Sequence, residues 1–210
     1  MNVRQLRNVI RTVMVTAAAL AATSAAITAA AADPLLGAPP SPVPALDLTR
    51  YLGTWDQLAA VPQPYELACA RDTQARYTLD PAGNVRVDNT CTTWSGTPNR
   101  ITGTATVTDP DTGAQLHVSF PGVPTQDQLD GPPNYIVTAL DTDYAWAVVT
   151  DPYRLSGFVL SRTAELSAAQ WDRIRSGIIA AGMNPCLYLT SPTTGGIDTI
   201  EPLCTLRPAT

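Results

Sequence analysis

From residue 55 to residue 162 the chain repeats one pattern, in which apolar and polar side chains alternate over short runs separated by turn residues. Alternation at period two is typical of β-strands with one buried face. The turns at 80–83 and 109–113 contain Asp, Pro and Gly, which favour tight chain reversals. The alternating runs span residues 55–61, 71–79, 84–92, 101–108, 114–120, 135–140, 144–150 and 155–162.

This order of elements predicts an all-β fold, an eight-stranded antiparallel up-and-down β-barrel. Short connections place consecutive strands side by side, and closure into a barrel removes exposed strand edges. One connection is long, the Pro- and Gly-bearing loop 121–133. An interior of eight strands is just wide enough for packed side chains or one small ligand.

A single helix is predicted after the last strand, over residues 167–181. Ser167 followed by Gln170 forms a capping box, which marks a helix start. An apolar stripe at i, i+3 and i+7 can then lie against the outside of the barrel; it consists of Trp171, Ile174 and Ile178. A short strand at 186–189 and a loop at 191–196 are expected to follow.

The first 32 residues are predicted to be a cleaved signal peptide. Arginines at positions 4, 7 and 11 precede an apolar, alanine-rich run that ends in Ala-x-Ala steps, so cleavage is expected after Ala30 or Ala32. A membrane anchor is the alternative, but large apolar residues are few and no basic stop-transfer cluster follows. No cysteine lies near the cleavage site, so no lipid anchor is expected. The mature protein is predicted to be secreted or held in the cell envelope.

After the signal, the chain divides into a tether and one domain. Residues 33–45 are rich in proline and small side chains, which is typical of a semi-extended linker. Residues 46–210 form a domain large enough to bury a core and keep a cavity. Its C-terminal part is expected to be a tail tied down by a disulfide.

The charge of the chain argues against some partners. The formal net charge is −5, and removal of a signal containing three arginines and no acids lowers it to −8. The sequence contains no lysine. A surface with this charge repels nucleic acid and anionic lipid, so neither is expected as a partner.

Four cysteines lie beyond the signal, and an even number in an exported chain predicts two disulfides. If strands 71–79 and 84–92 pair across their turn, Cys69 approaches the level of Cys91. This register favours Cys69–Cys91 together with Cys186–Cys204.

Little in the sequence points to catalysis. His117 is the only histidine, and in its alternating strand it shares a face with Gln115 and Ser119, so it is predicted to face solvent. One histidine and paired cysteines leave no standard zinc or haem ligand set and no Ser-His-Asp triad. Nucleophile-elbow and phosphate-loop patterns are absent. We therefore predict that the protein is not an enzyme and holds neither a metal nor a cofactor.

Three short motifs in order resemble the lipocalin family, closest to bacterial lipocalins and apolipoprotein D-like proteins. They are Gly53-x-Trp55, the Thr-Asp-Tyr run at 142–144, and Arg162 at the end of the last strand. The resemblance covers residues 46 to about 182. It implies that Gly53, Trp55 and Arg162 form a structural floor, in which a guanidinium stacked on an indole contributes about 1–2 kcal/mol.

The resemblance also keeps a second disulfide pairing open. Apolipoprotein D-like proteins bridge their second strand to the C-terminal tail, which would correspond to Cys69–Cys204 with Cys91–Cys186. A catalytic barrel thiol, as in isomerase-type lipocalins, would need an unpaired cysteine, which the even count disfavours.

Strand parity, counted from the floor pair Trp55 and Arg162, predicts which side chains line the barrel. Aromatic and small residues mix in this set, which suits a ligand with an apolar tail. The alternative is that they simply fill the core, and a β-bulge would reverse any of the assignments. The predicted ligand-binding residues are Gln57, Ala59, Tyr77, Tyr135, Val137, Ala139, Phe158 and Leu160.

Two functions are compatible with this barrel. The first is binding of a small hydrophobic ligand, such as a fatty acid, a lysophospholipid or a similar lipid, by a monomer, for transport, storage or sequestration. The second is a protein-interaction or inhibitor module that acts through its rim loops, suggested by the loop 121–133 and by Trp94 in a turn.

Overall fold

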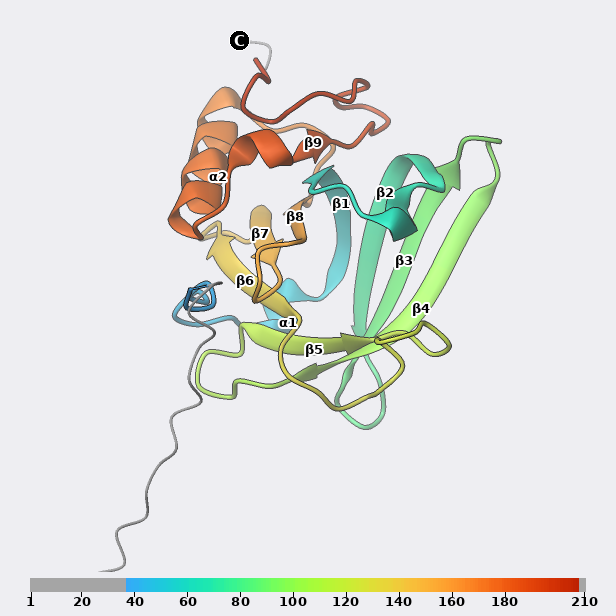
Figure 1. The fold of residues 1–210 in the computed structure, drawn as a ribbon, viewed down its shortest axis with the longest axis vertical. Helices are drawn as coiled ribbons and strands as arrows, with labels where there is room; N and C mark the ends of the chain where they lie inside the picture. Colours follow the sequence, from blue (N-terminus) through green and yellow to red (C-terminus); the bar gives the residue numbers. More distant parts are fainter. Residues whose placement is uncertain (1–36, 208–210) are drawn as a thin grey trace, which may run out of the picture.

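The computed structural model describes residues 37–207, and these form one antiparallel sheet curled into a barrel (Figure 1). The strand order is β2-β3-β4-β5-β6-β7-β8-β1-β9, and a further β1–β2 pairing closes the ring. The predicted eight-stranded barrel is thereby confirmed, with β9 as an addition. The strands are β1 (Gly53–Ala60), β2 (Cys69–Leu79), β3 (Val85–Thr93), β4 (Pro98–Val107), β5 (Gln115–Ser119), β6 (Tyr135–Leu140), β7 (Trp146–Thr150), β8 (Gly157–Ser161) and β9 (Leu189–Thr190).

Closure is complete at only one end of the barrel, which we call the floor. There, residues 53–56 of β1 pair with residues 74–77 of β2. Toward the opposite end, the mouth, β1 leaves β2, and Ala59 and Ala60 pair with β9 instead. Strands β2, β3 and β4 extend beyond this separation as a tall layer (Figure 1). We call residues 69–73 of β2 and 89–93 of β3 the lip.

Helix α2 (Ala168–Ala180) packs on the outside of the barrel, as predicted. Ser167 and Gln170 form the expected capping box, and the stripe Trp171, Ile174 and Ile178 is buried. A four-residue helix, α1 (Leu48–Tyr51), leads into β1 and is capped by the Asp47 carboxylate. Two 3-10 turns, η1 (Pro64–Glu66) and η2 (Pro185–Leu187), complete the helices of residues 37–207.

The strand expected at 186–189 is shorter and begins later. Residues 185–187 form η2, because Pro185 lacks an N–H for a ladder and the Asn184 side chain accepts a hydrogen bond from the Cys186 N–H at 2.9 Å. Pairing starts only at Leu189.

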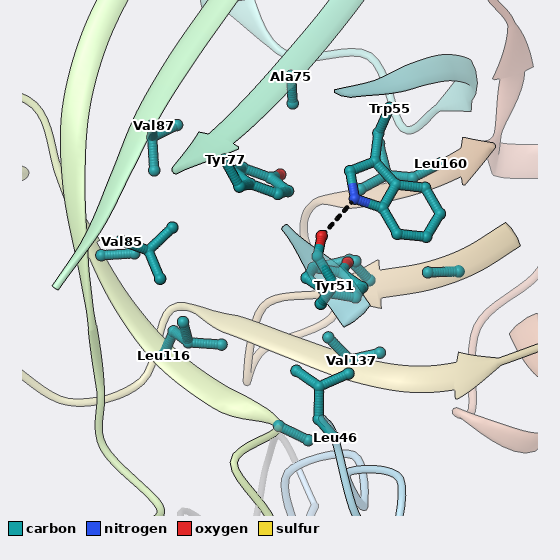
Figure 2. Close-up of a cluster of buried hydrophobic side chains, with 14 of the residues drawn as sticks. Leu46, Tyr51, Trp55, Ala75, Tyr77, Val85, Val87, Leu116, Val137 and Leu160 are labelled. Atoms are coloured by element: carbon teal, nitrogen blue, oxygen red, sulfur yellow. Dashed lines mark hydrogen bonds between the residues drawn. The ribbon is translucent and has the colours of Figure 1, made fainter. Parts of the chain in front are cut away.

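The buried side chains form two hydrophobic clusters, one inside the barrel and one on its outer surface. The inner cluster contains Trp55, Tyr77 and Val137 (Figure 2). The outer cluster joins α2 to the outer faces of the strands, and contains Trp146, Val148 and Trp171.

Two β-bulges change which side chains belong to the inner cluster and which to the outer one. The β1–β8 register shifts between Gln57 and Ala59, and the β6–β7 register shifts between Val137 and Ala139. Beyond each shift, the residues that faced inward by parity face outward. Bulges also increase strand twist, which helps a sheet to curl into a barrel.

The N-terminal segments are only partly described. The predicted signal peptide, residues 1–32, and the first four residues of the predicted tether lie outside the described residues. Residues 37–45 contain no helix or strand, and they contact the barrel: Val43 N–H donates to the Val137 carbonyl and Arg154 donates to the Ala38 carbonyl, both at 2.8 Å. Within 37–207, every helix is too short or too polar to cross a membrane.

Both disulfides have the pairing that the strand register favours, Cys69–Cys91 and Cys186–Cys204. The alternative pairing of strand to tail does not occur. Cys69–Cys91 joins β2 to β3 at the lip, where the β2–β3 register is interrupted. Cys186–Cys204 closes the tail that carries β9.

Candidate ligand-binding site

The floor is built from the three residues that the motifs singled out. The Arg162 guanidinium lies 3.6 Å from the centre of the Trp55 ring and donates to the carbonyls of Thr54 and Leu52 at 2.8 Å. Gly53 has φ +100°, and a Cβ there would lie 3.2 Å from Arg162 Nη1. A side chain at position 53 would therefore strain the backbone and crowd the guanidinium.

Three tyrosines lie on the inner side of the floor. The Tyr135 hydroxyl shares hydrogen bonds with Tyr51 at 2.8 Å and with Tyr77 at 3.2 Å. Burial raises the pKa of all three phenols, that of Tyr77 to about 12, so the cluster is uncharged at neutral pH. Trp55 Nε1 donates to the Tyr51 carbonyl at 2.8 Å (Figure 2), which ties the floor to α1.

Six of the eight predicted lining residues face the inside. Tyr77, Val137 and Leu160 belong to the inner cluster, and Tyr135 and Phe158 pack against it. The sixth is Gln57, which pairs with Leu160 across the β1–β8 ladder.

The predicted inward orientation of Ala59 and Ala139 is wrong. Ala59 is a member of the outer cluster and Ala139 packs against it. A Cβ on Gly177 of α2 would lie 2.7 Å from the Ala139 Cβ, so this side chain faces the helix. The two bulges are the cause, because each adds one residue immediately before these positions in the chain and so reverses the alternation there.

A cavity of about 170 Å³ opens at the mouth, where β1 and β2 separate. One wall comes from the end of β1 and the turn after it, another from the lip, and a third from the tail around β9. A larger hollow of about 480 Å³, between Arg175 and residues 204–207, is separate from these walls. The mouth cavity is lined by Gln57, Ala60, Pro62, Gln63, Glu66, Leu67, Cys69, Ala70, Arg71, Thr73, Trp94, Leu189, Thr190, Ser191, Pro192 and Ile200.

Gln57 and Glu66 form the polar centre of this cavity. The buried Gln57 amide donates to Glu66 Oε1 at 2.9 Å and to Ser191 Oγ at 3.3 Å. Burial raises the pKa of the Glu66 carboxyl, although hydrogen bonds from Gln57 and the Gln63 backbone oppose the shift. The site therefore contains an acid whose charge is poorly compensated by its surroundings.

Sequence reasoning missed Glu66 and the tail residues of the cavity. Glu66 lies in a 3-10 turn, η1, for which strand parity has no meaning. The only available signal was an acid in the otherwise apolar run from Pro64 to Ala68. The tail residues reach the mouth through β9, whose pairing with β1 joins residues far apart in the chain.

His117 does not face solvent as predicted, since only 7% of it is exposed. It points to the outer face of β5, but the long loop covers it. Its Nδ1 and Nε2 lie 2.7 and 3.0 Å from the carbonyl oxygens of Pro132 and Gln128. His117 therefore anchors the loop 121–133 and lies apart from the cavity. Within residues 37–207, no cluster of His, Cys, Asp or Glu has the size to hold a metal ion.

The antiparallel barrel, the Arg–Trp floor and the cavity at one open end together define a single-chamber barrel of the kind that holds one small ligand.

The chain belongs to the lipocalin family. A family model described as a lipocalin-like domain matches residues 46–190. Temperature-induced lipocalin-1 of Arabidopsis thaliana is 32% identical over 142 residues, 67% of this chain and 75% of that protein. The outer membrane lipoprotein Blc of Escherichia coli K12 is 32% identical over 161 residues, 76% of this chain and 84% of that protein. Bovine apolipoprotein D is 30% identical over 119 residues, 51% of this chain and 62% of that protein.

Solved structures support the same fold. Lobster apocrustacyanin A1 superposes with a TM-score of 0.53 at 16% identity, covering 69% of this chain and 78% of that one. The cockroach allergen Per a 4 also superposes with a TM-score of 0.53, at 18% identity, covering 70% of this chain and 88% of that one. Lipocalins bind small hydrophobic ligands and are in general binding or transport proteins.

Proposed function

We propose that this lipocalin is exported and binds one amphiphilic lipid, such as a fatty acid or a lysophospholipid, at the mouth of its barrel. It would act as a monomer, in transport, storage or sequestration. The observation that carries the proposal is the cavity between β1 and β2, because its walls are mostly apolar and it opens to solvent at one end.

The packing inside the barrel supports a ligand at the mouth instead of at the floor. The floor side of the chamber is filled by Trp55, Tyr51 and Tyr77, all buried. Val87 on β3 faces inward, so Asn89, two residues further on, and its cross-strand partner Ile101 on β4 also face inward. Ile101 is nonetheless exposed to solvent. The inner surface near the lip therefore offers a further apolar contact. A cavity of about 170 Å³ is smaller than the roughly 300–1,000 Å³ of drug-sized sites, so it would hold one end of a lipid.

Native mass spectrometry of the protein exported from its own host, before and after organic extraction, tests the proposal. An extra mass that leaves with the solvent would identify the ligand. Ala70→Trp, which places an indole in the cavity wall, is expected to abolish that mass and to prevent lipid binding measured by calorimetry. Ala82→Trp, in the exposed turn between β2 and β3, is the matched control. Equal lipid binding by both variants would contradict a site at the mouth.

A second function is favoured by the exposed apolar side chains of the rim loops. Leu67 is 72% and Trp94 69% exposed, and Leu155 is similarly exposed. Hydrogen bonds connect these loops to one another. Trp94 Nε1 donates to the Leu67 carbonyl at 2.9 Å, and the Gln63 side chain donates to the Leu155 carbonyl at 2.7 Å. Such a patch can be a protein-docking surface. Leu67→Ser with Leu155→Ser would then abolish function, whereas Ala70→Trp would preserve it.

A further inference from the structure

The mouth cavity contains one positive and one negative side chain, and only the positive one has partners of opposite charge. Among the described residues that line it, Arg71 and Glu66 are the only ones with a charged side chain, because Cys69 is in a disulfide. The Arg71 guanidinium already forms ion pairs with Asp72 and Asp198, each at 3.1 Å. Glu66 forms no ion pair within residues 37–207, and its hydrogen-bond donors, the Gln57 amide and the Gln63 backbone, are both neutral. One negative charge in the cavity is therefore left without a cation.

The surroundings of Glu66 suit an organic cation better than a hydrated inorganic one. Apolar side chains from three separate segments line the same cavity, among them Leu67, Ala70 and Leu189. Trp94 adds an aromatic ring, and indole faces attract ammonium groups that carry alkyl substituents. The charge of the whole chain is also negative, which would attract cationic ligands over longer distances.

We propose that the ligand's polar end is an alkylammonium group, with Glu66 as its counter-ion and Trp94 as its aromatic contact. This inference rests on the proposed function and narrows it, because it disfavours the fatty acid among the lipids given there as examples. A primary or quaternary amine on an apolar body places its cation beside Glu66 and its chain against the lip. A free carboxylate would meet the Glu66 charge with no unpaired cation to balance it.

Three ligands with the same ten-carbon chain test this selectivity: decyltrimethylammonium, decanoate and 1-decanol. Each is titrated by isothermal calorimetry at pH 8, below the concentration at which it forms micelles. We expect the cation to bind about tenfold more tightly than decanoate. Glu66→Gln should remove this preference by weakening the cation about tenfold while leaving 1-decanol nearly unchanged.

Two further variants control for net charge and for misfolding. Glu165→Gln removes the same charge from an exposed site that does not line the cavity, and should leave all three affinities unchanged. Trp94→Leu keeps an apolar side chain at an exposed position and should weaken the cation more than the alcohol. This second variant tests the inference even if Glu66→Gln folds poorly.

The outcomes separate this inference from the function on which it rests. Equal affinity for the three ligands, or tighter binding of decanoate, would overturn the alkylammonium preference and leave a lipid-binding lipocalin. If Glu66→Gln and Glu165→Gln weakened binding of the cation equally, the preference would come from the net charge of the protein, and the role of Glu66 as counter-ion would be overturned. Failure of all three ligands to bind would overturn both proposals.

Discussion

The floor and the mouth of this barrel are built by opposite means. At the floor, β1 pairs with strands on both sides, and Arg162 lies over Trp55 and donates to the backbone turn beside it. At the mouth, β1 and β2 part, and the gap is bridged by a disulfide-closed tail and by side chains such as Asp72. Buried side chains fill the floor, whereas the mouth contains a cavity.

The tail contacts of the lip show how the open end is held. Asp72, at a positive φ of 53°, accepts from the Thr194 N–H and its own N–H donates to the Pro192 carbonyl at 2.9 Å. Although burial opposes the shift, hydrogen bonds from Thr194 and the Arg71 charge lower the pKa of Asp72. The lip is therefore held by a few polar contacts and one covalent bond, whereas the floor combines the Arg162 hydrogen bonds with a buried aromatic core.

Trp55→Ala should have the largest effect of any single substitution on this contrast. The indole is fully buried, and its loss removes both the floor packing and the Arg162 stack, so we expect a loss of about 3–5 kcal/mol. Urea unfolding measures it. Trp94→Ala at the mouth is the matched control, and its effect on stability should stay within about 0.5 kcal/mol. Equal losses from the two tryptophans would show that floor and mouth do not differ in this way.

Removal of the Cys69–Cys91 disulfide by a double Cys→Ser substitution should come next, at about 2–4 kcal/mol. The effect should also be local, because the bond lies at the lip. Hydrogen exchange is expected to speed up at residues 69–73 and 89–93, while residues 53–56 at the floor remain protected. Uniformly faster exchange over both ends would contradict a separately held lip.

Gly177→Ala tests the bulge that turns Ala139 outward. Helix propensity alone would make this change stabilising by about 1 kcal/mol. The new Cβ would lie 2.7 Å from the Ala139 Cβ, so we expect overpacking to cost about 1–3 kcal/mol instead. Ser176→Ala, on the exposed side of α2, should show the propensity gain without the clash. A stabilised Gly177→Ala variant would mean that Ala139 does not face the helix.

Glu66→Gln should have the smallest effect on stability, and its sign should depend on pH. Burial raises the pKa of the folded-state carboxyl above its unfolded value of about 4.3. Below that value both states are protonated, so variant and wild type should be equally stable. As the pH rises above about 4.3, the Glu66 carboxyl ionises in the unfolded chain before it ionises in the folded protein. The wild type therefore loses stability relative to the variant until the pH passes the raised folded-state pKa.

Thermal unfolding at pH 3.5 and pH 8 measures this difference. The variant should match the wild type at the lower pH and be the more stable protein at the higher pH. A variant that is less stable at pH 8 would mean that the ionised carboxyl is compensated in the folded state, and that the cavity is not poised to receive a cation.

The strands, the helix and the floor could be predicted because their signals are local. Alternation at period two, turn residues and the capping box at Ser167 each act within a few residues. Trp55, Gly53 and Arg162 belong to motifs that can be read directly in the sequence. The single turn between β2 and β3 brings Cys69 near the level of Cys91, which is why that pairing could be favoured, although two register shifts at the lip set the final alignment.

The errors arose where distant segments decide the conformation. Ala59 and Ala139 each follow a β-bulge, and strand parity cannot detect an added residue. His117 is covered by a loop that contacts it only in the folded chain. Glu66 became part of the cavity because β1 and β2 part at the mouth, which no local pattern records.

The Cys69–Cys91 bond has a practical consequence for anyone preparing this protein. Reducing conditions in the cytosol keep such thiols apart, whereas export to an oxidising compartment joins them. Recombinant chain made in the cytosol is expected to fold its Trp55 end while residues 69–73 keep only their hydrogen bonds to β3 and to the tail, so a ligand screen on it would test a lip without its covalent bond. Secretory expression is therefore the production route expected to give the chain with Cys69–Cys91 formed.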